Sequence, residues 1–233
     1  MTEQIIKHQT PHIAKHVFGD CAFTSEVYLM DCMELMAQYP DNYFDLAVVD
    51  PPYGKRPTRG KNGFGSSETI NFQPDDDKWD VKPNKEYFEE LFRVSKNQII
   101  WGGNYFIENL YATNCFLIWD KLTGENPYAD CEMAWTSFNS VVKKYTKLWL
   151  GSHCKDVFDL IHPTQKPVSL YEWIFKNYTT EGMKILDTHL GSGSSRIAAN
   201  KANLHFTGCE LDKKYFKKSC KRYDDFVSQV RLF

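Results

Sequence analysis

Two short stretches of the sequence combine residue types that could bind a ligand and carry out chemistry on it. The first is the tetrapeptide Asp50-Pro51-Pro52-Tyr53, which directly follows the apolar run Leu46–Val49. Open α/β sheets bind their ligands at the carboxyl ends of their strands, so this tetrapeptide is expected in an active site. Asp50 and the Pro51 carbonyl could accept two hydrogen bonds from one exocyclic amino group, while Tyr53 stacks on the ring that carries it. The alternative is an aspartate that only caps the turn after a strand.

The second stretch is a turn with two glycines, Gly191-Ser192-Gly193. Glycines between a strand and a helix allow the backbone to approach a ligand closely. Glu210 follows 19 residues after Gly191, where an acid could accept hydrogen bonds from both hydroxyls of a ribose. Arg196 occupies the place of the third glycine of a dinucleotide fingerprint, which disfavours NAD. A cofactor with a ribose but no phosphate, such as S-adenosyl-L-methionine, fits better; a tight turn without a ligand is the alternative.

The composition limits the class of protein. The chain has 233 residues, of which 42% are apolar, and its formal net charge is −2, so one domain with a sizeable core is expected. No run approaches the ~18 consecutive apolar residues of a membrane span, and the N-terminal residues have no apolar signal core, so no membrane association or secretion is expected. The seven cysteines include no C-x-x-C pair, which disfavours disulfides and a metal site and favours a cytoplasmic location.

Strands and helices are predicted to alternate along the chain. Strands are expected at 27–31, 44–50, 98–101, 115–119, 184–187 and 206–210, with weaker candidates at 132–135 and 146–150. Helices are expected at 33–39, 87–92, 171–178, 195–202 and 215–223, and residues 54–79 have the composition of a loop. A strand, a helix and a second strand within about two dozen residues form a βαβ unit, so the sheet is expected to be parallel.

In combination, these motifs resemble the beta-class amino-methyltransferases of DNA. The resemblance covers approximately residues 25–225 and depends on residues 50–53, 162–167, 187–195 and 208–211. It implies a Rossmann-like, S-adenosylmethionine-dependent α/β fold with a mostly parallel seven-stranded sheet, helices on both faces and a circularly permuted motif order. It also implies methyl transfer to the exocyclic N6 amino group of adenine in DNA, because Asp rather than Ser begins the tetrapeptide, with flipping of the target base. Restriction-modification is the setting that such enzymes suggest.

The resemblance assigns roles to individual residues. Asp50, Pro51, Pro52 and Tyr53 would be catalytic. The residues expected to bind the cofactor are Asp31, Thr164, Gln165, Lys166, Asp187, Gly191, Ser192, Gly193 and Glu210. Among them, Asp31 would contact the adenine of the cofactor, Glu210 its ribose, and residues 164–166 would help to enclose its methionine end. The pair Thr188-His189 departs from the Pro-Phe that is usual in this family, which alters the wall of the methionine pocket.

Contacts with DNA are expected from the segment that follows the tetrapeptide. Its four cations, Lys55, Arg56, Arg59 and Lys61, could clamp backbone phosphates, although a solvated loop is the alternative. Trp101 is a further candidate, for the pocket of the target base. The chain is expected to be a single methyltransferase domain, 1–233, in which residues 120–160 would be a small target-recognition insertion. So short an insertion favours a homodimer.

Other functions stay open on the sequence. A cytosine N4 methyltransferase or an RNA adenine methyltransferase would use the same site. A non-catalytic, nucleic-acid-binding partner subunit would keep the fold without the activity, but the intact tetrapeptide and glycine turn argue against it. An NAD oxidoreductase is disfavoured by Arg196.

Overall fold

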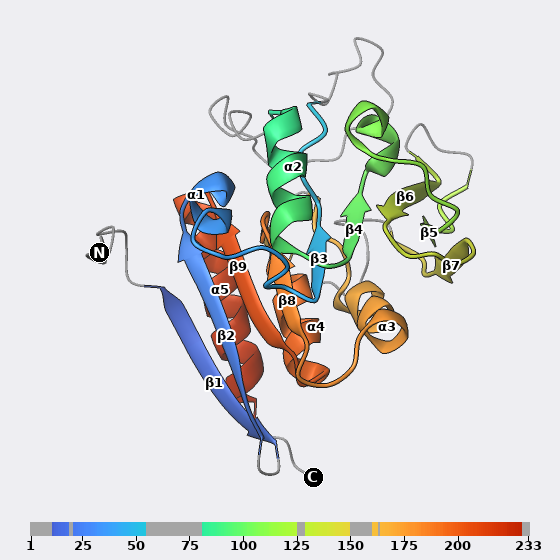
Figure 1. Ribbon diagram of the computed structural model, residues 1–233. Coiled ribbons are helices and arrows are strands. Elements are labelled where there is room, and N and C mark those ends of the chain that lie inside the picture. Colours follow the sequence, from blue (N-terminus) through green and yellow to red (C-terminus); the bar gives the residue numbers. More distant parts are fainter. Residues whose placement is uncertain are drawn as a thin grey trace, which may run out of the picture.

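In the computed structural model, residues 11–18, 21–54, 81–124, 129–149, 160–162 and 164–229 are described. They form one nine-stranded sheet in the order β1-β2-β9-β8-β3-β4-β6-β5-β7 (Figure 1). The strands are β1 (His12–Phe18), β2 (Cys21–Leu29), β3 (Leu46–Val49), β4 (Gln98–Trp101), β5 (Phe116–Asp120), β6 (Cys131–Thr136), β7 (Lys143–Thr146), β8 (Lys184–Asp187) and β9 (His205–Glu210).

The centre of the sheet is parallel, as predicted. Strands β2, β9, β8, β3 and β4 are parallel neighbours, and all four residues of β3 are buried, which fits an apolar run without alternation. The predicted number of seven strands was wrong. Strand β1 adds an antiparallel partner to β2 at one edge, and β7 adds a parallel partner to β5 at the other. These edge strands are partly exposed, so their sequences lack the apolar runs of the centre.

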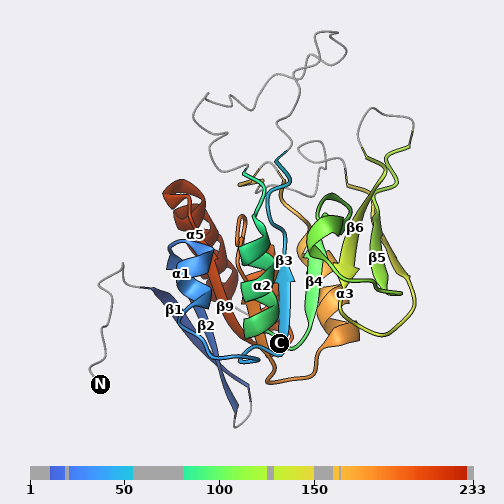
Figure 2. The same ribbon diagram turned by 45° about the horizontal axis from the view of Figure 1, so that its top comes forward.

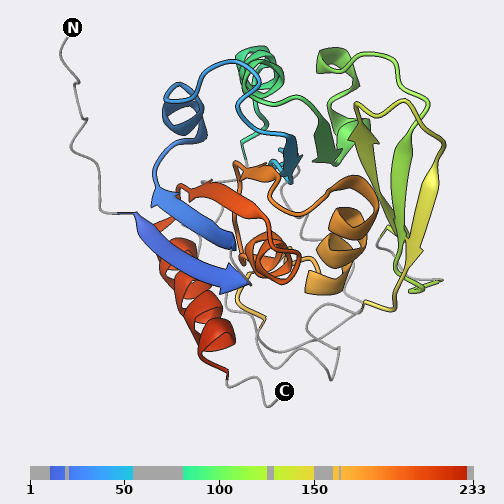
Figure 3. The same cartoon turned by 60° about the horizontal axis from the view of Figure 1, so that its bottom comes forward.

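Helices cover both faces of the sheet (Figures 2 and 3). Helices α1 (Cys32–Met36) and α2 (Lys85–Val94) pack on one face, and α3 (Val168–Tyr178), α4 (Ser194–Lys201) and α5 (Lys213–Ser228) pack on the other. Two short 3₁₀ helices, η1 (Gly103–Tyr105) and η2 (Ile107–Asn109), follow β4. The two faces therefore hold two separate apolar cores, one with α1 and α2 and one with α3 and α4.

Arg196 has a structural role that explains why a third glycine is absent. It lies in α4, is fully buried, and donates a hydrogen bond from Nε to the Ser25 hydroxyl at 2.7 Å. Its guanidinium carbon lies 3.8 Å from the centroid of the Tyr223 ring. Arg196 thus ties α4 to both β2 and α5, and a glycine would leave this space empty.

Residues 129–149 extend the sheet at the edge that is opposite to β1. Strand β6 lies between β4 and β5, and β7 lies beyond β5. The strand predicted at 146–150 was wrong in position, because β7 spans Lys143–Thr146. The use of residues 120–160 as a target-recognition insertion stays a prediction, and residues 125–128 and 150–159 within it lie outside the described ranges.

Candidate active site

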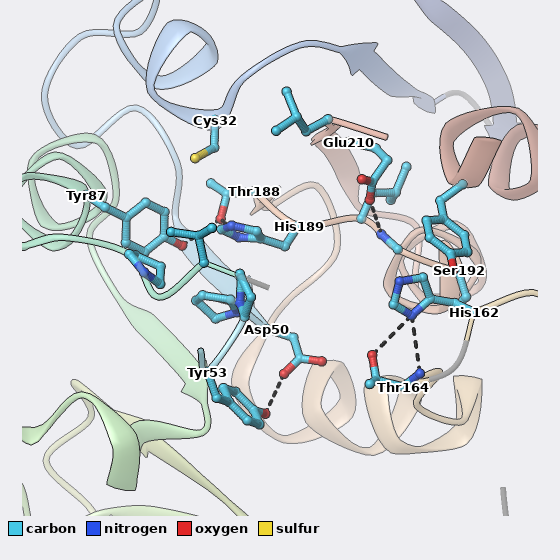
Figure 4. Close-up of a pocket in the computed structure, with 18 of the residues that line it drawn as sticks. Cys32, Asp50, Tyr53, Tyr87, His162, Thr164, Thr188, His189, Ser192 and Glu210 are labelled. Atoms are coloured by element: carbon cyan, nitrogen blue, oxygen red, sulfur yellow. Dashed lines mark hydrogen bonds between the residues drawn. The ribbon is translucent and has the colours of Figure 1, made fainter. Parts of the chain in front are cut away.

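A cavity of about 610 Å³ opens where the central strands end. The Asp50–Tyr53 tetrapeptide after β3 lines one part of its wall, and Gly191, Ser192 and Glu210 line another (Figure 4). The parallel pairing of β3 with β8 and of β8 with β9 brings these carboxyl ends together. Two stretches that are far apart in the sequence thus share one crevice.

The catalytic tetrapeptide is held in place by its neighbours. Strand β3 ends at Val49, because neither Pro51 nor Pro52 has an N–H to donate to the sheet. The Tyr53 hydroxyl then donates a hydrogen bond to Asp50 Oδ1 at 2.7 Å. Burial and the negative charge of Asp50 raise the pKa of the Tyr53 hydroxyl well above its usual value, so this group stays a donor.

The Tyr53 ring is fixed by the segment that follows β4. It stacks on Tyr105 in η1 with ring centroids 4.8 Å apart and planes at 28°. Gly102 makes this approach possible, since a Cβ at this position would lie 2.1 Å from Tyr53 Cε1. Gly102 also has a positive φ of 69°, which favours glycine. Nothing in the sequence around Gly102 indicated that it makes room for the Tyr53 ring.

The glycine turn is anchored by a buried carboxylate. Asp187, at the end of β8, accepts hydrogen bonds from the His189 N–H at 3.0 Å and from the Ser195 hydroxyl at 2.5 Å. Burial raises the pKa of Asp187 to about 7, with hydrogen bonds lowering it and the charges of Asp50 and Glu210 raising it further. Asp187 is not on the cavity wall, so it shapes the turn from behind.

Glu210 lies at the end of β9, and its carboxylate faces the same turn. Its Oε2 accepts a hydrogen bond from the Gly191 N–H at 2.8 Å, and its Oε1 accepts one from the Asp212 N–H at 2.9 Å. Each oxygen keeps a further lone pair for a ligand. Gly193 is the N-cap residue of α4, has a positive φ of 72° and does not line the cavity. Asp31 lines the cavity and caps α1 through the Met33 N–H at 2.7 Å.

The segment before α3 lines the cavity with three of the predicted residues. Thr164, Gln165 and Lys166 are all on its wall. The Thr164 hydroxyl lies 3.1 Å from His162 Nδ1. The Lys166 side chain points toward the tetrapeptide, where its ammonium donates a hydrogen bond to Asp50 Oδ2. Of this segment, Lys166 therefore contacts the tetrapeptide directly.

Glu132 is a wall residue that the sequence analysis missed. It lies in β6, with its Oε1 2.6 Å from Lys121 Nζ and its Oε2 3.1 Å from Lys166 Nζ. Burial raises the pKa of Glu132, but the two ammonium groups more than offset this and hold it below its usual value. The signal that could have indicated Glu132 is the occurrence of an acidic residue within a short, otherwise mostly apolar strand.

The structure bears on only one of the five residues that were expected to contact DNA. Lys55, Arg56, Arg59 and Lys61 lie outside the described residues. Trp101 is fully buried in the core and does not line the cavity. Its ring centroid lies 5.5 Å from Lys166 Nζ, so it packs beneath this lysine, and a contact with the target base stays a prediction.

The pair Thr188-His189 forms a polar part of the wall. The Tyr87 hydroxyl lies 2.7 Å from Thr188 Oγ1, which lies 2.9 Å from His189 Nδ1. The Tyr87 and His189 rings meet edge to face at 5.5 Å. Burial lowers the pKa of His189 to about 4, so the imidazole is neutral near pH 7.

We expect the wild-type protein to lose stability relative to the variant His189→Asn as the pH falls from about 6.5 to about 4. In this window the unfolded chain binds a proton at His189 and the folded protein does not, so acid favours unfolding. The difference should reach on the order of 3 kcal/mol near pH 4 and stay constant above pH 7. Urea unfolding of both proteins from pH 4 to 8 measures it; parallel curves would contradict the buried neutral imidazole.

Two further features of the described residues concern metal binding and membrane-spanning helices. Among the described residues, no three His, Cys, Asp or Glu side chains gather in a way that would hold a metal ion. Within the same ranges, every helix is too short or too polar to cross a membrane.

Comparison with known proteins identifies the family. Residues 77–221 match the model of the N6_N4_Mtase family, described as DNA methylase, and the chain therefore belongs to this family of DNA amino-methyltransferases. The match begins after the tetrapeptide, so the assignment of Asp50–Tyr53 to the active site depends on their position in the cavity wall.

Curated relatives agree with this family. The chain is 24% identical over 248 residues to the type II methyltransferase M2.MboI of Moraxella bovis, covering 88% of this chain and 89% of the relative. It is 25% identical to the type II methyltransferase M.HpaI of Haemophilus parainfluenzae, covering 83% and 72%.

Solved structures confirm the fold class. The complex of M1.HpyAVI with SAM has a TM-score of 0.56 at 19% identity, covering 85% of this chain and 98% of that one. The cytosine-N4-specific PvuII DNA methyltransferase has a TM-score of 0.57 at 12% identity, covering 85% and 86%. The fold is thus that of the DNA methyltransferases, and these neighbours do not decide between adenine and cytosine.

Proposed function

We propose that this protein transfers a methyl group from S-adenosyl-L-methionine to the exocyclic N6 amino group of adenine in DNA. The observation that carries the proposal is the shared cavity, which is lined by Asp50, Tyr53, Gly191 and Glu210, with Asp50 and Tyr53 opposite Glu210 (Figure 4). One part of the wall offers hydrogen-bond acceptors for an amino group, and the other offers a carboxylate for a ribose. Methyl transfer requires a binding site for each of these groups within one crevice.

The residues present fit S-adenosylmethionine, which supplies an electrophilic methyl group when it is bound. Glu210 is oriented by the Gly191 and Asp212 N–H groups and keeps lone pairs for two ribose hydroxyls. Asp31 lines the same cavity, and the family resemblance assigns it to the adenine of the cofactor. The volume of about 610 Å³ falls within the usual range of about 300–1,000 Å³ for small-molecule sites.

The tetrapeptide fits an exocyclic amino group on an aromatic ring. Such a nitrogen is a poor nucleophile, because its lone pair is delocalised into the ring. Hydrogen bonds from its two N–H groups to Asp50 and to the Pro51 carbonyl would localise this lone pair toward the methyl group. Because Tyr53 and Lys166 already orient the Asp50 carboxylate, it would stabilise the positive charge that develops on nitrogen without rearranging. The aspartate at the first position favours adenine over cytosine.

The site also fits a base that has left the DNA helix. An amino group inside a duplex cannot reach a cavity, so the target base is expected to flip out. Tyr53, whose ring stacks on Tyr105, lines the cavity and would contact this base through its aromatic ring. Such stacking contributes about 1–3 kcal/mol per base and replaces part of the stacking lost from the duplex. The homodimer expected from the short recognition region stays a prediction.

Labelled methyl transfer followed by nucleoside analysis tests the proposal. The protein is incubated with DNA or RNA and with S-adenosylmethionine that carries an isotopically labelled methyl group. We expect the label in N6-methyladenine from DNA. Label in N4-methylcytosine would establish the cytosine alternative, and label in RNA alone would reassign the substrate. No transfer to a DNA that contains many different sequences would contradict the proposal.

A further inference from the structure

Lys166 is a buried cation inside the cavity wall. Its side chain is only 4% exposed, and burial of a single ammonium is very unfavourable unless carboxylates compensate it. Two do so: its Nζ donates to Asp50 Oδ2 and lies 3.1 Å from Glu132 Oε2. The Lys166 Nζ also lies over the Trp101 ring, 5.5 Å from the ring centroid. Lys166 therefore links the catalytic aspartate to strand β6.

The ion pairs continue beyond Glu132 into a row of alternating charges. Glu132 Oε1 lies 2.6 Å from Lys121 Nζ, so the order is Asp50, Lys166, Glu132 and Lys121. Two negative and two positive groups balance, which allows the inner members to be buried. Because Lys121 and Glu132 compensate each other, the positive charge of Lys166 remains available to Asp50.

The contacts of Asp50 leave its carboxylate little freedom to turn. Tyr53 donates to Oδ1 at 2.7 Å and Lys166 donates to Oδ2. A carboxylate oxygen can accept more than one hydrogen bond, so each oxygen can still accept one from a substrate. The two contacts thus set the carboxylate plane before a substrate arrives.

We propose that Lys166 is a positioning residue for methyl transfer, which orients the Asp50 carboxylate and stabilises its charge. This inference rests on the proposed function, and it assigns Lys166 to the amino-group side of the cavity rather than to the methionine end of the cofactor. Lys166 acts through Asp50 and exchanges no proton. A misplaced or rotating Asp50 would accept the amino hydrogen bond less often in the geometry that leads to reaction, so the loss should appear in kcat.

Chemical rescue of a truncated lysine tests this role. We expect Lys166→Ala to lower kcat by about 10²-fold while the affinity for S-adenosylmethionine, measured by calorimetry, is unchanged. Propylamine replaces the atoms removed, from Cγ to Nζ, and should restore part of the lost kcat. Propan-1-ol has a similar size without the charge and should not. Lys166→Met, which keeps an unbranched apolar stem, should show the same loss and thereby separate charge from packing.

A matched lysine provides the control. Lys96 pairs with Asp45 at 2.6 Å, but its side chain is 53% exposed and it lies outside the cavity wall. Lys96→Ala should keep the wild-type kcat and show no response to propylamine. Wild-type kcat in Lys166→Ala, equal rescue by propan-1-ol, or a loss confined to cofactor affinity would each overturn the inference.

A readout without turnover separates this inference from the proposed function. The ¹³C signal of the Asp50 carboxyl carbon can be assigned by comparison with Asp50→Asn. Propylamine should shift this signal in Lys166→Ala and leave it unchanged in Lys96→Ala. If the wild type transfers no methyl group, the proposed function fails, whereas the absence of the shift shows that Lys166 does not act on Asp50.

Discussion

Replacing Asp50 with asparagine is expected to lower kcat by about 10²–10³-fold and to leave the affinity for S-adenosylmethionine unchanged. Asparagine keeps the shape of the side chain but loses the negative charge. That charge stabilises the positive charge that develops on the amino nitrogen. It also leaves the Lys166 ammonium, which donates to Asp50 Oδ2, without one of its two carboxylates. Initial rates at saturating cofactor and DNA measure the effect on kcat, and calorimetry measures the affinity.

Asp41→Asn is the matched control for this substitution. The Asp41 side chain is 72% exposed and pairs with Arg93 at 2.7 Å, remote from the cavity wall. An exposed ion pair of this kind contributes little to stability, so activity should stay at the wild-type level. If Asp50→Asn were as active as Asp41→Asn, Asp50 could not be the acceptor of the amino hydrogen bond.

Replacing Glu210 with alanine is expected to weaken S-adenosylmethionine binding by at least about 10-fold. Each hydrogen bond to a charged group contributes about 1.5–3 kcal/mol, and the variant loses both those to the ribose and the one that holds the Gly191 N–H at 2.8 Å. The kcat at saturating cofactor should change much less, because Glu210 lies away from the reacting amino group. Isothermal titration with S-adenosylmethionine measures the dissociation constant.

Glu181→Ala serves as the control for the Glu210 variant. Glu181 is exposed in the turn before β8 and is not part of the cavity wall. Its replacement should leave the dissociation constant unchanged. An unchanged constant in Glu210→Ala as well would contradict the assignment of Glu210 to the ribose.

The central strands and both ends of the cavity could be predicted from the sequence. Leu46–Val49 is apolar without alternation, and its four residues are all buried in β3. The predicted strands at 98–101 and 184–187 coincide with β4 and β8. Because parallel strands end at the same edge of the sheet, the predicted parallel sheet places the tetrapeptide and Glu210 at one edge, and the structure brings them to one cavity.

The parts that could not be predicted depend on contacts without a local pattern. Lys166 and Asp50 are 116 residues apart, and nothing in either segment indicates their pairing. Glu132 joins them only because β6 inserts between β4 and β5. Trp101 ends a strand, as a wall residue would, but it points into the core. The ends of the strands thus predict the edge of the sheet at which a site lies. Which side chains pair with one another across that site can be seen only in the structure.

A crystal structure with bound S-adenosylmethionine tests most directly whether methyl donor and amino acceptor sites face each other. We predict that the ribose hydroxyls contact Glu210 and that the methyl group points into the space in front of Asp50 and Pro51. A cofactor bound outside this cavity, or bound within it with the methyl group directed away from the tetrapeptide, would contradict the assignment.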